Sequence, residues 1–103
     1  MQLGIVITDE TLGENAVGVM KAAYARGWSN SCFLTDRGVL LLKDETFCDL
    51  MREHDLNVAV CELSMERYQH PAASESDLMQ KVVIGGQYQD AVMVHKSDRV
   101  LVF

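Results

Sequence analysis

The sequence of 103 residues contains no long apolar run and almost no proline. Pro71 is its only proline, and no apolar run exceeds four residues, as at Val39 to Leu42. A helix that crosses a bilayer needs about 20 apolar residues, and a secretory leader needs basic residues before its apolar core. Acids come early here, at Asp9 and Glu10. We therefore expect a soluble cytoplasmic protein with no membrane partner.

Basic side chains are also scarce. Nine Lys and Arg residues are scattered among 15 Asp and Glu residues, for a formal net charge of −6. Binding to nucleic acid requires clustered cations that neutralise phosphates, so no nucleic-acid partner is expected. An acidic surface of this kind mainly aids solubility.

Cysteine is present, but not in a pattern that forms disulfides or binds zinc. The count of three is odd, and no Cys-x-x-Cys pair occurs. The three histidines are widely separated and fall on or beside helical stripes, so we expect no metal site. In a reducing cytosol each cysteine is either a buried hydrophobe or a reactive thiol. The cysteines are Cys32, Cys48 and Cys61.

Apolar strand patterns alternate with helical patterns along the whole chain. This alternation is typical of βαβ units, and it predicts a single domain over residues 1–103. The expected fold is a three-layer α/β/α arrangement of flavodoxin or Rossmann type, with a mainly parallel sheet of about five strands. The predicted strands cover 3–7, 32–35, 58–61, 82–84 and 100–103, and the predicted helices cover about 16–24, 45–54, a short stretch from 64, and 87–96.

Particular residues mark the ends and the inward faces of the predicted helices. Gly27 is placed to end the first helix in a left-handed conformation, and Asp44 is placed to cap the second. The chain around Pro71 and residues 72–77 reads as a loop. The residues expected to face inward are Phe47, Leu50, Met51 and His54 on the second helix, and Tyr88, Ala91, Val92 and His95 on the last.

Cys61 is the main candidate for a working residue. It ends an apolar strand pattern and precedes the start of a short helix, and side chains at the carboxyl ends of parallel strands line the ligand crevice of α/β sheets. Ser64 is expected to cap that helix, whose start would lower the thiol pKa, and Arg67 and His70 would add positive charge. The alternative is that Cys61 is simply the last buried residue of its strand.

No cofactor is expected. The Gly85-Gly86 pair lacks the further glycines or lysine of a phosphate-binding loop and fits a tight turn better. The loop from Thr8 to Gly13 carries acids that would repel a phosphate. Flavin and nucleotide binding are therefore disfavoured.

Three segments resemble the DsrE/DsrF-like family, which includes the sulfur-relay TusBCD subunits. Phe33 to Val39 is similar to the family's F-x-T-x-x-G-V stretch after the second strand. The segment from Cys61 to Ser64, with Arg67 beyond, is similar to its C-x-x-S segment after the third strand. The ending, Ser97 to Phe103, resembles its closing strand.

The resemblance implies a function as well as a fold. Family members are cytoplasmic homo- or hetero-oligomers (dimers, trimers or hexamers), and in active members a cysteine carries sulfane sulfur as a persulfide between donor and acceptor proteins. On this sequence that role falls on Cys61, with Ser64 and Arg67 as supporting residues. The alternative is a non-catalytic structural or regulatory subunit of the same fold.

Overall fold

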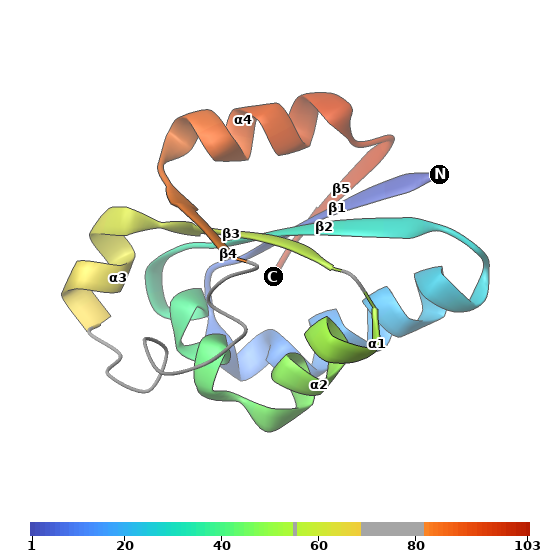
Figure 1. Ribbon diagram of the computed structural model, residues 1–103, viewed down its shortest axis with the longest axis horizontal. Coiled ribbons are helices and arrows are strands. Elements are labelled where there is room, and N and C mark those ends of the chain that lie inside the picture. The colour runs from blue at the N-terminus through green and yellow to red at the C-terminus, as the bar shows by residue number, and fades with distance from the viewer. Residues whose placement is uncertain (55, 69–81) are drawn as a thin grey trace.

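The protein is built around one five-stranded sheet in which every strand pair is parallel (Figure 1). The computed structural model describes residues 1–54, 56–68 and 82–103. The predicted α/β class and parallel sheet are confirmed, whereas His70, Pro71 and the loop expected at 72–77 lie outside the described residues. The strands are β1 (Gln2–Ile7), β2 (Ser29–Leu34), β3 (Asn57–Cys61), β4 (Val82–Gly85) and β5 (Arg99–Val102).

The strand order in the sheet is β4-β3-β2-β1-β5. Successive strands from β1 to β4 are laid down outward toward one edge, as in Rossmann-type winding. The chain then returns across the sheet to place β5 on the other side of β1. All five carboxyl ends therefore meet at one edge of the sheet, and the turns that follow the strands gather there.

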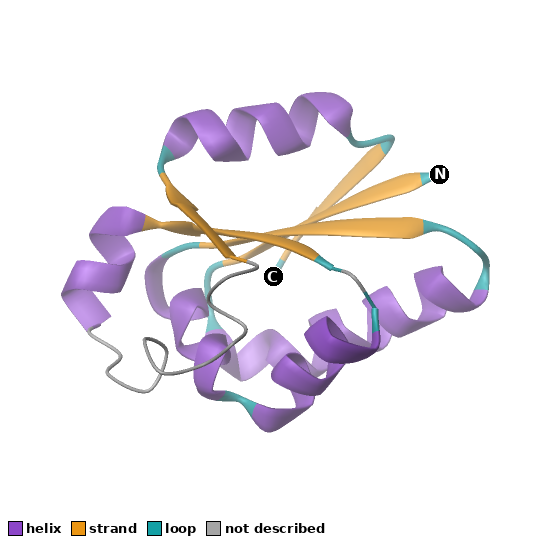
Figure 2. Cartoon of the chain, in the orientation of Figure 1, coloured by secondary structure: helices purple, strands orange, loops and turns teal. Residues whose placement is uncertain are grey.

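Helices cover both faces of the sheet, which gives three layers (Figure 2). Two of them, α1 (Gly13–Ala25) and α2 (Glu45–Glu53), lie on one face, and α4 (Gln87–Lys96) lies alone on the other (Figure 1). The short helix α3 (Glu62–Tyr68) extends from the carboxyl end of β3, and two 3-10 helices, η1 (Glu10–Leu12) and η2 (Asp36–Lys43), follow β1 and β2. Within the described ranges, no helix is long and apolar enough to cross a membrane.

The core is divided unequally by the sheet. The larger cluster packs on the α1 and α2 face and includes Val58 and Val60 of β3. The smaller cluster packs on the α4 face and consists of Phe33, Cys61 and Met93 with partly buried Val6 and Ala59 around it. Because alternate residues of a strand point to opposite faces, Cys61 and Ala59 share the α4 face.

The two helix ends identified in the sequence are confirmed. Gly27 has a φ of 79°, the left-handed conformation expected just after α1. The Asp44 carboxylate accepts a hydrogen bond of 2.9 Å from the Phe47 N–H and so caps α2. His54 ends that helix only half-buried, and its ring stacks on Tyr24 with 3.9 Å between ring centroids, which ties the ends of α1 and α2 together.

The predicted inward face of α4 is wrong, although its bounds are right. Tyr88, Ala91 and His95 are exposed, and Met93 is the buried residue of the helix. Only Val92, which is half-buried, belongs to both the predicted stripe and the observed one, where Gln89 and Lys96 also line the sheet side. A rotation of one residue, about 100° around a helix, accounts for the difference.

Candidate functional site

Cys61 lies at the carboxyl edge of the sheet, where three neighbouring strands end together. It is the last residue of β3, and its register partner on β4 is Gly85. On the other side Leu34 of β2 pairs with Val60, so Thr35, the next residue, lies beside Cys61. This edge is the position at which α/β sheets bind their ligands.

The Ser64 and Thr35 hydroxyls and the backbone N–H groups at the start of α3 are the groups that act on the Cys61 thiol. Its pKa is lowered, chiefly by the Ser64 hydroxyl, and further by the Thr35 hydroxyl and the backbone N–H groups of Ser64 and Leu63, although partial burial opposes the shift. Donors stabilise the thiolate more than the thiol, since only the charged form accepts strong hydrogen bonds. The residue keeps 9% of its surface exposed. Cys61 is therefore a buried residue of the small core cluster on the α4 face, as the alternative interpretation expected, and its surroundings nevertheless favour the thiolate.

Ser64 acts differently from the cap that the sequence predicts. Strand β3 continues into α3 without a loop, so the helix begins at Glu62 and Ser64 lies in its first turn. The Ser64 Oγ accepts a hydrogen bond of 2.8 Å from the backbone N–H of Asp36, in the turn after β2. The same oxygen lies 3.5 Å from the Thr35 Oγ1, so the Ser64 and Thr35 hydroxyls are neighbours beside Cys61, and both lower its pKa.

The turn after β2 holds an unusual backbone conformation. Asp36 has a φ of 49°, and it is the only non-glycine residue of the described ranges with positive φ. Aspartate tolerates this left-handed region better than most residues, at a cost of about 1 kcal/mol or more. The conformation directs the Asp36 N–H at Ser64, so the strain is located where it orients the thiol's main donor.

Gly38, two residues further on, is required by close packing. A Cβ added at this position would overlap the carbonyl oxygen of Ile7, which is a backbone atom of β1 and cannot rotate away. The glycine thus lets η2 pack directly against the end of β1. That contact anchors the segment that carries Thr35 and Asp36.

Arg67, the other predicted supporting residue, does not supply charge to the thiol. Its guanidinium pairs with the Asp36 carboxylate at 3.9 Å, its side chain is well exposed, and it is not among the groups that shift the Cys61 pKa. An exposed pair at this distance contributes little stability. Arg67 and Asp36 therefore flank the site, and the thiol is activated by hydrogen bonds.

A second, tighter ion pair lies further out on the same edge. The Arg37 Nε donates to both carboxylate oxygens of Glu10 at 3.0 and 3.1 Å, and its guanidinium lies over the Tyr68 ring at 5.7 Å from the centroid. This pair lowers the pKa of Glu10. It links η1, η2 and α3 around the site.

The other two cysteines lie in different environments. Cys32 is enclosed in the core, and burial raises its pKa far above the ordinary value. Cys48 is 8% exposed, nearly as much as Cys61, but burial raises its pKa and its thiol donates to the Leu42 carbonyl at 3.2 Å. A thiol that donates is held in its protonated form, so Cys48 is not a second candidate nucleophile.

Thr35 and the Asp36 N–H are contributors that residue patterns alone did not single out. Both belong to the Phe33 to Val39 segment that resembles the DsrE/DsrF-like motif. The signal that could have found them is topological: β2 and β3 are consecutive parallel strands, so the residue that follows β2 must lie beside the end of β3.

The loop after β1 is internally hydrogen-bonded. The Asp9 carboxylate accepts from the Thr11 N–H at 2.9 Å and from its hydroxyl at 2.7 Å, which lowers the Asp9 pKa. A phosphate would have to displace this carboxylate to reach the N–H. Within the described ranges, no group of three or more His, Cys, Asp and Glu side chains is arranged to hold a metal ion.

No protein-family model matches the chain, and no curated protein matches it. The function is therefore argued from the site itself.

Proposed function

We propose that the protein is a small sulfur carrier in which Cys61 accepts a sulfane sulfur, holds it as a persulfide and passes it to a cysteine of a partner protein. The observation that carries the proposal is the position of Cys61 at the carboxyl edge of the sheet, where two hydroxyls and two backbone N–H groups lower the thiol pKa. The motif resemblance to DsrE/DsrF-like proteins supports the same assignment.

The proposed chemistry is two thiol exchanges. In the first, the Cys61 thiolate attacks the terminal sulfur of a donor persulfide R–S–SH; a new S–S bond forms on Cys61, the donor S–S bond breaks, and the donor leaves as a thiolate. In the second, a partner thiolate attacks the terminal sulfur of the Cys61 persulfide. A new S–S bond forms on the partner, the S–S bond on Cys61 breaks, and Cys61 leaves as a thiolate. No external oxidant or reductant is consumed, because each exchange conserves one S–S bond.

A lowered pKa assists both exchanges. It raises the thiolate fraction that attacks the donor, and it makes Cys61 a better leaving group in the second step. A reducing compartment would keep Cys61 from forming disulfides, so we assign the protein to the cytoplasm.

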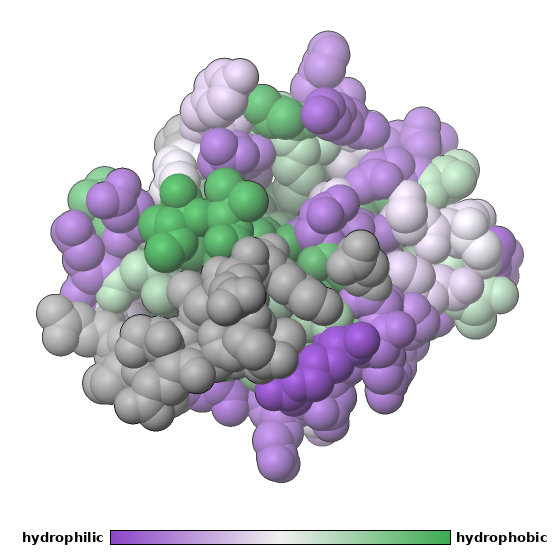
Figure 3. All heavy atoms as spheres, viewed as in Figure 1, coloured by the Kyte–Doolittle hydropathy of each residue, from purple (hydrophilic) through white to green (hydrophobic). Residues whose placement is uncertain are grey.

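Assembly into homo- or hetero-oligomers belongs to the proposal as well. Val83 and Ile84 of the edge strand β4 are 51% and 52% exposed, and Leu101 and Val102 of the opposite edge β5 are also exposed. Figure 3 shows apolar surface gathered between α3 and α4, where Figure 1 draws β4. Unpaired apolar edge strands are typical pairing surfaces. They also favour the second candidate, a subunit that serves assembly without sulfur transfer.

Mass spectrometry distinguishes the two candidates. The wild type and Cys61→Ser are exposed to a low-molecular-weight persulfide, and the added mass is mapped to peptides. We expect one extra sulfur on the peptide that contains Cys61 and none on the variant. Cys48→Ser is the matched control, since Cys48 has nearly the same exposure. Equal sulfur uptake by wild type and Cys61→Ser would contradict the carrier function and leave the assembly role.

A further inference from the structure

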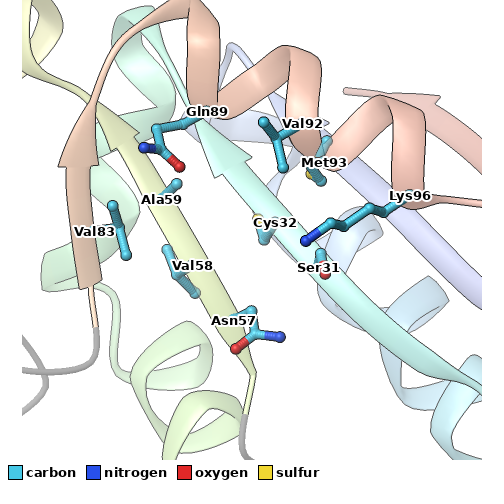
Figure 4. Close-up of a pocket in the computed structure, with 10 residues that line it drawn as sticks. All are labelled: Ser31, Cys32, Asn57, Val58, Ala59, Val83, Gln89, Val92, Met93 and Lys96. Atoms are coloured by element: carbon cyan, nitrogen blue, oxygen red, sulfur yellow. The ribbon is translucent and has the colours of Figure 1, made fainter.

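A pocket of about 240 Å³ lies between α4 and the sheet, apart from the groups that act on the Cys61 thiol (Figure 4). Its floor is formed by β2, β3 and β4, and its roof by α4 from Gln89 to Lys96 (Figure 4). One water molecule needs only about 10–15 Å³ of such space. The pocket is therefore large enough for a small organic molecule. Cys61 is not among the residues that line it.

Polar residues occupy one end of the floor. Ser31 and Asn57 are register neighbours on β2 and β3, so they form a short polar row on the α4 face, next to Gly4 of β1. Further along the same face the strands carry Val6, Phe33 and Ala59. A sheet covered by helices on both faces is normally apolar throughout. The polar row therefore marks this end of the pocket as different from a packed interface.

The pocket places a cation in an acidic protein. Among the described residues that line it, Lys96 is the only charged one and none is Asp or Glu, although the chain has 15 acids. The Lys96 side chain extends over the floor at the polar end (Figure 4). Asp98, the closest acid in sequence, accepts from the Gln2 N–H at 2.7 Å instead. Lys96 makes no ion pair within the described residues.

The other end of the pocket is mostly apolar, with the Gln89 carboxamide among its side chains (Figure 4). Val83 forms an open wall on β4, Ala59 the floor, and Val92 and Met93 the roof. The two carboxamides of the lining, Asn57 and Gln89, have no hydrogen-bond partner among the described residues. The Asn57 amide and the Lys96 ammonium at the polar end suit a single negative charge, whereas a phosphate dianion usually recruits arginine or several cations.

From this arrangement we infer that the pocket binds a small monocarboxylate with an apolar body. The carboxylate lies against Lys96 and the Asn57 amide, and the apolar body lies on Ala59, Val83 and Met93. Ligand pockets of this kind have mostly apolar walls and a few polar groups that fix orientation. The site is distinct from the proposed sulfur-transfer site, and its occupancy does not require Cys61.

Titration of the full chain with hexanoate, followed by amide chemical shifts, tests the inference. We expect saturable shifts at Ser31, Ala59, Val83 and Lys96. Hexanamide has the same shape without the charge, and we expect it to bind at least about tenfold more weakly than hexanoate, because a charge-assisted hydrogen bond is lost. We expect the same loss for hexanoate binding to Lys96→Met. Lys43→Met, another exposed lysine at the end of η2, binds hexanoate like the wild type.

Three results would overturn the inference. These are the absence of saturable shifts at the pocket, equal binding of hexanoate and hexanamide, and equal binding by Lys96→Met and Lys43→Met. Cys61→Ser is titrated in parallel and is expected to bind hexanoate like the wild type. Failure of sulfur transfer would therefore leave this result unaffected, and the two proposals fail separately.

Discussion

The backbone N–H of Asp36 donates a 2.8 Å hydrogen bond to the Oγ of Ser64, 28 residues further along the chain. This bond joins the turn after β2 to the first turn of α3, and it holds in place the hydroxyl that contributes most to the lowered pKa of Cys61. The lowered pKa of the thiol is thus a product of two strand ends meeting, and it does not depend on a nearby cation.

Replacement of Ser64 by alanine removes the main donor to the Cys61 sulfur. Hydrogen bonds to charged groups contribute about 1.5 kcal/mol or more, so alkylation of Cys61 at neutral pH should slow by roughly tenfold. Thr35→Val should slow it less, because the Thr35 hydroxyl contributes less to the shift. Iodoacetamide kinetics measured on the Cys61 peptide give the rates.

Ser97→Ala is the matched control for Ser64→Ala. The Ser97 hydroxyl donates to the Met93 carbonyl at 2.7 Å, at the far end of α4 from the thiol. Its loss should lower stability without changing the alkylation rate. An equal slowing in both variants would mean that the effect comes from loosened structure and not from the lost donor.

The positive φ of Asp36 predicts an order of stabilities. Asp36→Gly should be about 1 kcal/mol more stable than Asp36→Ala, since glycine adopts φ 49° without the steric cost that alanine has. Urea denaturation measures the difference. At Asp49, an exposed position within α2, the order should reverse by a similar amount, because alanine is the better helix former. The same order at both positions would contradict the backbone assignment at Asp36.

Two glycines should respond to alanine in opposite ways. Gly38→Ala forces a Cβ into the Ile7 carbonyl oxygen and should cost about 2–3 kcal/mol. Gly18→Ala lies within α1, where an added Cβ meets nothing within 4 Å, and should stabilise by about 0.5–1 kcal/mol. Urea midpoints of the two variants measure the change in stability at each position. A mild effect at Gly38 would show that η2 does not pack against β1 as described.

The three cysteines should differ in native reactivity. Cys61 should be alkylated first. Cys32 and Cys48 should react only after unfolding, because burial raises their pKa values and so lowers the fraction of each that is thiolate. Peptide mapping after timed exposure to iodoacetamide gives the order. Cys48 has nearly the exposure of Cys61, so equal rates for these two would mean that access, and not thiolate character, governs reactivity.

The sequence was sufficient to predict the order of strands and helices because each pattern is local. The apolar runs at β1 and β3, the left-handed Gly27 and the Asp44 cap all follow from residues within a few positions of one another. The face of α4 was mispredicted for the opposite reason. More than one side of α4 carries apolar residues, and packing against the sheet decides which side is buried.

The site was predictable only in its central residue. Cys61 was found because a strand end is visible in the sequence, but its donors come from β2 and from a helix that starts two residues earlier than expected. The role of Asp36 was hidden entirely, since it donates through its backbone. Contacts between a backbone N–H and a distant side chain leave no mark on residue type.

The pKa of the Cys61 thiol tests the central claim most directly. The pH dependence of alkylation at the Cys61 peptide is measured for the folded protein and for the same protein unfolded in urea. The donors from Ser64, Thr35 and Leu63 predict a midpoint at lower pH in the folded protein. A folded midpoint equal to or above the unfolded one would contradict the activation of Cys61 and, with it, the sulfur-carrier function.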